Sequence, residues 1–205
     1  MKSFKIVLIA LFAVVVFACN QKPAQKEDGN VAYFRHVQFT ETPWDIEKGT
    51  HALTAEEAET VNNYKFTYNE NKQLVSVEYN RNGVLLDYSS LGAAKITYTY
   101  VGNKQTKHYY NDKGESQKSG GATTLEYTLN DDGMRVGLQF LDENGEPMEN
   151  RNNINNYKWK RLEDGMIQEL RYNLAGEEVV MNPFCPFYEL RFSYDEKGYL
   201  VRMAN

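Results

Sequence analysis

The sequence predicts an all-β fold, an antiparallel meander of repeated β-hairpins with a repeat of about 31 residues and one short helix near its N-terminus. Between polar turns, apolar and polar side chains alternate with a period of two, which is typical of half-buried strands. Two interleaved series of glycines mark these turns. The first series has a constant spacing of 31 residues: Gly83, Gly114, Gly145 and Gly176. The second has spacings of 31, 32 and 33 residues: Gly102, Gly133, Gly165 and Gly198.

The N-terminus predicts export and lipidation. Lys2 and Lys5 precede an apolar run over 6–18, which is typical of a signal peptide and short for a transmembrane helix. The stretch VFAC at 16–19 resembles the lipobox of bacterial lipoproteins. That resemblance implies cleavage after residue 18, acylation of Cys19 and a lipid-anchored place in a bacterial cell envelope, with the outer membrane favoured. A membrane helix retained in the mature protein is the weaker alternative.

A tether and a small cap are expected before the repeats. The tether is polar and lacks apolar periodicity, which favours flexibility. In the cap, alternation predicts a strand over 33–39, and the capping-box spacing of Thr54 and Glu57 predicts a helix over 55–61. The predicted organisation is a signal peptide (1–18), a lipidated tether (19–31), an N-terminal cap (32–63) and a hairpin-repeat domain (64–205).

Each repeat is expected to place one apolar face on the core. Tyr64, Phe66 and Tyr68 share a face, and Lys65 and Thr67 lie on the other. Equivalent strands begin at Ile96, Leu125, Tyr157 and Tyr188. The second strands are expected to place Val75, Val77 and Tyr79 inward in the first copy and Val136, Leu138 and Phe140 in the third. Variable loops join the units at 91, 119, 150 and 182.

Two positions depart from this repeat. Lys72 stands in the first turn where the other copies have glycine. His108 falls, by the 31-residue spacing, in the apolar row of Val77 and Leu138. A half-buried structural histidine is a stronger interpretation of His108 than a catalytic one.

The turn-bearing segments have a family resemblance. FTYNENKQLV from 66 and FSYDEKGYLV from 192 resemble the YD repeats of the RHS family, and the repeats are also similar to MORN-like proteins and repeat-bearing lipoproteins. The likeness covers about 135 residues. It implies a continuous sheet of hairpins that forms a curved open shell, a spiral or a partly closed barrel.

Composition excludes several classes of function. Without residues 1–18 the chain has 21 basic and 28 acidic side chains, a net charge of −7, which argues against nucleic acid as a partner. Once Cys19 is lipidated, Cys185 is the only remaining cysteine, so an intramolecular disulfide is impossible, and a free thiol in a buried apolar loop is expected. The histidines have no metal-ligand spacing, so no metal or other cofactor is predicted.

No catalytic residues are predicted. The paired acids at 56–57, 131–132 and 177–178 lie at helix starts or turns, where capping explains them better than a glycosidase pair does. Calcium at the acidic turns is a weak alternative, because the ligand spacing of an EF-hand is absent. A hydrolase that uses His108 and a turn acid is the least favoured hypothesis.

A row of aromatic side chains recurs on one strand of every unit. It is either core, covered because the sheet curls, or partly exposed as a surface for a glycan, a protein or a peptide. The row comprises Tyr64, Phe66, Tyr68, Tyr98, Tyr100, Tyr127, Tyr157, Trp159 and Tyr188. The leading hypothesis is a non-enzymatic envelope lipoprotein that acts as a binding or scaffold module. Glycan or peptide capture on the aromatic row is the alternative.

Overall fold

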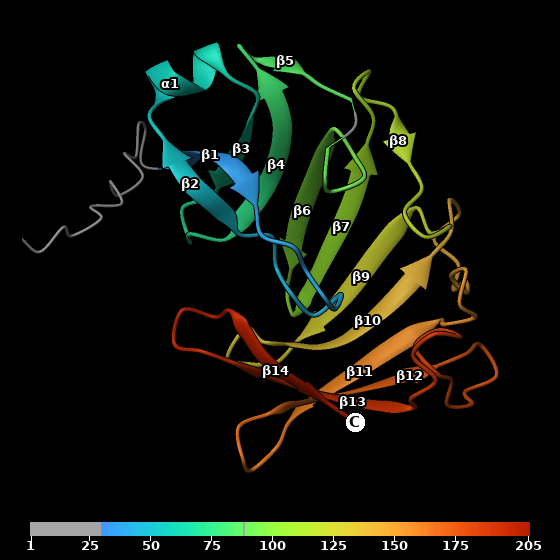
Figure 1. The fold of residues 1–205 in the computed structure, drawn as a ribbon. Helices are drawn as coiled ribbons and strands as arrows, with labels where there is room; N and C mark the ends of the chain where they lie inside the picture. The colour runs from blue at the N-terminus through green and yellow to red at the C-terminus, as the bar shows by residue number, and fades with distance from the viewer. Residues whose placement is uncertain (1–29, 88) are drawn as a thin grey trace, which may run out of the picture.

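A computed structural model of the chain describes residues 30–87 and 89–205. The predicted signal peptide, Cys19 and nearly all of the predicted tether lie outside these residues. The described chain is one antiparallel sheet with a single short helix, as the repeat predicts (Figure 1). Its elements are β1 (Val31–Val37), β2 (Gly49–Leu53), α1 (Ala55–Thr60), β3 (Asn63–Tyr68), β4 (Leu74–Arg81), β5 (Val84–Leu85), β6 (Lys95–Val101), β7 (Lys104–Tyr110), β8 (Ser116–Gln117), β9 (Thr124–Leu129), β10 (Arg135–Leu141), β11 (Asn156–Arg161), β12 (Ile167–Tyr172), β13 (Glu189–Tyr194) and β14 (Leu200–Ala204).

The strand order is that of a meander. From β14 back to β3, successive long strands pair with their neighbours in the chain, and the cap adds β1 and then β2 beyond β3. The short strands β5 and β8 pair with β4 and β7 at the side of this path. The sheet is open and curved, since β2 and β14 stand at its two ends (Figure 1).

The turn glycines have the backbone conformation that the sequence predicts. All eight members of the two series have positive φ, between 59° and 83°, which glycine adopts without steric cost. Lys72 takes the same conformation, with φ at 61°. The first turn therefore keeps the geometry of the others with a side chain that the geometry disfavours.

The helix predicted in the cap is confirmed, and the cap contains one further strand, β2. Thr54 and Glu57 form both hydrogen bonds of the capping box, and α1 follows directly. The predicted strand over 33–39 ends earlier, at Val37, and the side chain of Phe39 is 78% exposed. β2 was not predicted, because its five residues have no apolar alternation; it forms by pairing with β1.

Two predicted inward positions were wrong, Val136 in β10 and His108 in β7, whereas Leu138 and Phe140 of β10 are buried as predicted. In β10 the ladder shifts between Arg135 and Gly137, and this β-bulge turns Arg135 into the core while Val136 is only half-buried. In β7 the partner of the buried Tyr98 is Lys107, so Lys107 points inward and His108 lies on the other face. A slip of one residue exchanges the faces of a strand.

The concave face of the sheet is covered by the loop between β1 and β2, residues 38–48, called the inner loop below. Figure 1 shows it extending from the two strands into the space that the sheet encloses. Phe34, Val37 and Trp44 pack against the core from this part of the chain. The inner loop therefore supplies the covering layer that a single curved sheet needs.

Candidate functional site

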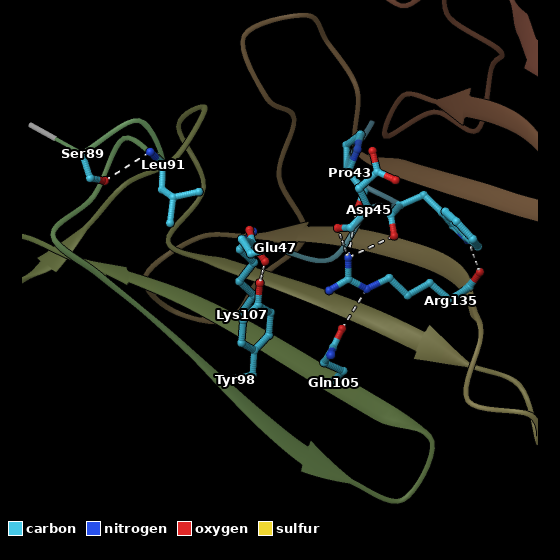
Figure 2. Close-up of polar contacts among 10 residues, drawn as sticks. Pro43, Asp45, Glu47, Ser89, Leu91, Tyr98, Gln105, Lys107 and Arg135 are labelled. Carbon is cyan, nitrogen blue, oxygen red and sulfur yellow. Dashed lines mark hydrogen bonds and ion pairs between the residues drawn. The ribbon is translucent and has the colours of Figure 1, made fainter. Parts of the chain in front are cut away.

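Glu47 anchors the inner loop to the middle of the sheet. Its carboxylate forms an ion pair with Lys107 and accepts a hydrogen bond from the Tyr98 hydroxyl (Figure 2). The side chains of Glu47 and Lys107 are 5% and 8% exposed. Burial opposes the ionisation of Glu47, but the charge and hydrogen bond of Lys107 and the hydrogen bond of Tyr98 outweigh it and lower the pKa of Glu47. Both groups are thus held ionised inside the fold.

Arg135 holds the backbone of the inner loop. Its Nη1 lies 3.1, 3.2 and 2.6 Å from the carbonyl oxygens of Pro43, Trp44 and Asp45 and donates to them (Figure 2). Its Nε donates to Gln105 Oε1 at 2.8 Å. The guanidinium lies 3.7 Å from the centroid of the Tyr127 ring, within the range of a cation–π contact. One buried side chain thus fixes three consecutive peptide units.

A second buried charge binds the loop near its start. Glu169 Oε2 accepts hydrogen bonds from the Thr42 hydroxyl and, at 2.9 Å, from the indole N–H of Trp159. Arg171 Nη1 lies 3.5 Å from the other carboxylate oxygen. Burial raises the pKa of Glu169, and the hydrogen bonds and Arg171 only partly offset it. These contacts join the cap to strands more than 110 residues away in the sequence.

At one end of the sheet the inner loop, three hairpin turns and the last strands enclose a cleft of about 490 Å³, called the turn-end cleft below. Trp44 and Tyr194 pack together here with ring centroids 5.0 Å apart. Lys48 closes one side, because its amine donates to the Gly198 carbonyl oxygen. The charged side chains of the wall are Asp45, Lys48, Asp132, Arg135, Arg161, Asp195 and Glu196.

The aromatic row is core for the most part. Tyr68 and Tyr100 are half-buried, and only Tyr188, at 55% exposed, is open to solvent. The fully buried members are Tyr64, Phe66, Tyr98, Tyr127, Tyr157 and Trp159. This burial agrees with the interpretation of the aromatic row as core, and the inner loop covers much of it. The aromatic rings of the turn-end cleft are instead Trp44 and Tyr194, neither of which belongs to the predicted row.

The other sequence candidates are dispersed. His108 lies on the outer face of β7, with its Nδ1 3.3 Å from the Thr124 hydroxyl. Cys185 is a free, half-buried thiol beside Phe184, which is 95% exposed, so the expectation of a buried loop was wrong. Within residues 30–87 and 89–205, no three His, Cys, Asp or Glu side chains are arranged to hold a metal ion.

No protein-family model fits the sequence, and no curated protein is significantly similar to it. The likeness to YD repeats therefore stays a prediction. In the described part of the chain, α1 is six residues long, and no helix has the length and apolar character needed to cross a bilayer.

Sequence reasoning missed the residues that build this site. The 31-residue spacing predicts His108 in the apolar row of β7, and the structure places the adjacent Lys107 there instead. The predicted inward row of β10 includes Val136, and the bulge beside the β9–β10 turn buries Arg135 in its place. The inner loop has no periodic pattern, although its Glu47 and Trp44 are residue types that are rarely left without partners when buried. The isolated Trp44 was the one available signal.

Proposed function

We propose that this protein is a non-enzymatic, lipid-anchored binding module of a bacterial cell envelope, and that its ligand occupies the turn-end cleft. The observation that carries the binding role is the composition of that wall. It combines an indole, a phenol ring and several carboxylates in one concavity of about 490 Å³. Ligand sites are typically concave, with a few convergent polar groups beside apolar surface.

A glycan is the ligand class that this wall favours. The rings of Trp44 and Tyr194 offer apolar faces for a sugar ring, and the carboxylates of Asp132 and Glu196 are exposed acceptors for sugar hydroxyl groups. Lys48 and Arg161 each donate to one carbonyl oxygen, of Gly198 and Gly165 respectively, and each keeps further N–H donors. The wall therefore presents acceptors from its carboxylates and donors from these cations, and sugar hydroxyl groups can bond to both. A basic peptide is the second candidate, because the same carboxylates would pair with its cations.

Fluorescence tests the binding role. The indole of Trp44 should change its emission when glycans from a broad panel are titrated, and Trp44→Phe should remove the response. Trp159→Phe is the matched control and should keep the response, because Trp159 is buried away from this wall. If no glycan and no basic peptide changes the emission of Trp44, the cleft is not a binding site for either class.

The anchoring role has a separate test. Cys19→Ala should move the protein from the membrane fraction to the soluble fraction, since several acyl chains are needed for firm anchoring. Cys185→Ala is the control and should leave the fractionation unchanged. If the Cys19→Ala variant stayed in the membrane fraction, the lipid-anchoring part of the proposal would be wrong. The proposed binding role of the turn-end cleft would not be affected.

A further inference from the structure

A second cavity lies beneath the β3–β4 turn and shares Ile46, Gly133 and Arg135 with the turn-end cleft. Its volume is about 340 Å³. Much of its wall is apolar, from Ile46, Tyr68, Leu74 and Leu129. The polar groups of the wall include Glu47, Lys72, Gln105 and Arg135. Two of these four have donors without a partner.

The first free donor is Nη2 of Arg135. Arg135 is 3% exposed, and its Nε and Nη1 are fully engaged, but Nη2 has no hydrogen-bond partner among the described residues. Figure 2 shows Nη2 on the side of the guanidinium that faces Glu47, whose side chain lines the same cavity. A buried donor without a partner costs about 1–3 kcal/mol, and more when it is charged. A ligand atom or a water must satisfy it for that cost to be avoided.

The polar groups next to Arg135 Nη2 already have hydrogen-bond or ion-pair partners. Gln105 accepts from Arg135 Nε and donates to the Tyr100 hydroxyl at 2.8 Å, and that hydroxyl donates to the Leu74 carbonyl oxygen at 2.9 Å. The carboxylate of Glu47 is occupied by Lys107 and Tyr98. Nη2 of Arg135 is therefore a donor without an acceptor, whereas the polar groups around it are paired.

The second free donor is the amine of Lys72, at the rim. It is exposed and has no ion pair among the described residues. The backbone of Lys72 is held at a φ of 61°, where the equivalent turns use glycine. Non-glycine residues in this conformation carry a strain that recurs at functional positions. The replacement of glycine by lysine places a cation at the mouth of the cavity that contains Arg135.

The charges of this cavity do not balance. Glu47 supplies one negative charge against two buried cations: it is ion-paired with Lys107, and its charge also acts on Arg135, which has no ion-pair partner among the described residues. The carboxylate of Asp45 lies beside Tyr194, and Asp45 is not part of this wall. Arg135 and Lys72 therefore leave two positive charges, one buried and one at the rim. We propose that the cavity binds a small organic carboxylate, with the carboxylate on Arg135 Nη2, the apolar body against Leu74 and Leu129, and Lys72 at the entrance.

Calorimetry with hexanoate and with neutral hexanamide tests the proposal. Hexanoate should bind the intact protein, and hexanamide should bind at least about tenfold more weakly, because it cannot form the charged hydrogen bond. The side-chain N–H signals of Arg135, followed by nitrogen-15 NMR in the unaltered protein, should shift with hexanoate alone. This readout avoids replacing a buried arginine on which folding depends.

Lys72→Gly separates a ligand role from a structural one. Glycine relieves the strained turn, so Tm should rise, and at the same time the affinity for hexanoate should fall about fivefold or more. Lys113→Ala, in the turn of the β7–β8 hairpin, is the matched control and should change neither quantity. Equal binding of hexanoate and hexanamide, an unchanged affinity in Lys72→Gly, or the absence of binding and of Arg135 shifts would each overturn the proposal. In the last case the cavity holds water only.

Discussion

Glu47 and Lys107 form an ion pair inside the curved sheet, although 60 positions separate them in the sequence. Because both charges are buried, removal of one leaves the other without compensation. We expect Glu47→Gln to lower the free energy of unfolding by about 3–5 kcal/mol, measured by urea denaturation. The control is Glu78→Gln, which breaks the more exposed pair with Lys95 and should cost less than about 1 kcal/mol. Equal losses in the two variants would contradict a buried pair.

The same carboxylate predicts a dependence on pH. Burial raises the pKa of Glu47, but the stronger effect of Lys107 and of the hydrogen bonds leaves it below its usual value. A carboxyl with a lowered pKa stabilises the folded state above its unfolded pKa of about 4.3, and this stability is lost as pH falls through the folded value. The difference in unfolding free energy between the unaltered protein and Glu47→Gln should therefore be constant above about pH 5 and shrink below about pH 4.

The measurement compares the unaltered protein with Glu47→Gln because a second buried acid, Glu169, changes the unfolding free energy with pH in the opposite direction. Burial raises the pKa of Glu169, so its contribution to stability is present at low pH and is lost as pH rises through its folded pKa. Glu169 is common to both proteins and cancels. A difference that stays constant down to pH 3 would show that Glu47 is not held ionised by Lys107.

Adjacent residues of β7 should respond very differently to truncation. Lys107→Ala leaves the buried Glu47 without its cation and should cost about 3–5 kcal/mol of unfolding free energy. His108→Ala removes only a contact to Thr124 on the other face and should cost less than about 1.5 kcal/mol. Thermal or urea unfolding of the two variants measures both. If His108→Ala were the more destabilising variant, His108 rather than Lys107 would face the core, as the 31-residue spacing predicts.

Gly49 should not tolerate a side chain. A Cβ at Gly49 would overlap the ring of Phe34, and that ring packs edge-on against the fully buried Phe66 at 5.1 Å. We expect Gly49→Ala to destabilise the protein by about 1–3 kcal/mol, because Phe34 must leave its position. Gly137→Ala is the control. Its Cβ would meet neighbours at ordinary contact distances of 3.6 Å or more, so a loss below about 1 kcal/mol is expected by differential scanning calorimetry.

The repeat and its turns were predictable because their causes are local. Positive φ at Gly114 follows from a polar four-residue turn, and the helix start follows from the spacing of Thr54 and Glu57. The faces of Lys107 and Arg135 were not predictable in the same way. A fixed spacing assumes that every ladder is regular, whereas the register shifts at three hairpins, beside Tyr68, Arg135 and Tyr194.

The candidate site was harder to foresee because the inner loop joins residues that are remote in sequence. Trp44 reaches the carbonyl oxygen of Arg135 across 91 positions, and no pattern within the loop encodes that partner. From the sequence, the aromatic row could be either core or an exposed surface. The choice between them depended on whether a covering segment exists, and that segment is polar and aperiodic.

The path of the inner loop bears on how the chain acquires its structure. Lys48 meets the Gly198 carbonyl oxygen across 150 positions, so this contact forms only after the last hairpin has been made. Closing so long a segment is entropically costly before any contact rewards it, and chains dominated by such contacts fold slowly. During synthesis the loop emerges well before the strands that enclose it. The hairpins can form one by one from local turns, and we expect burial of the Glu47 carboxylate to follow the pairing of β6 with β7, which carry Tyr98 and Lys107.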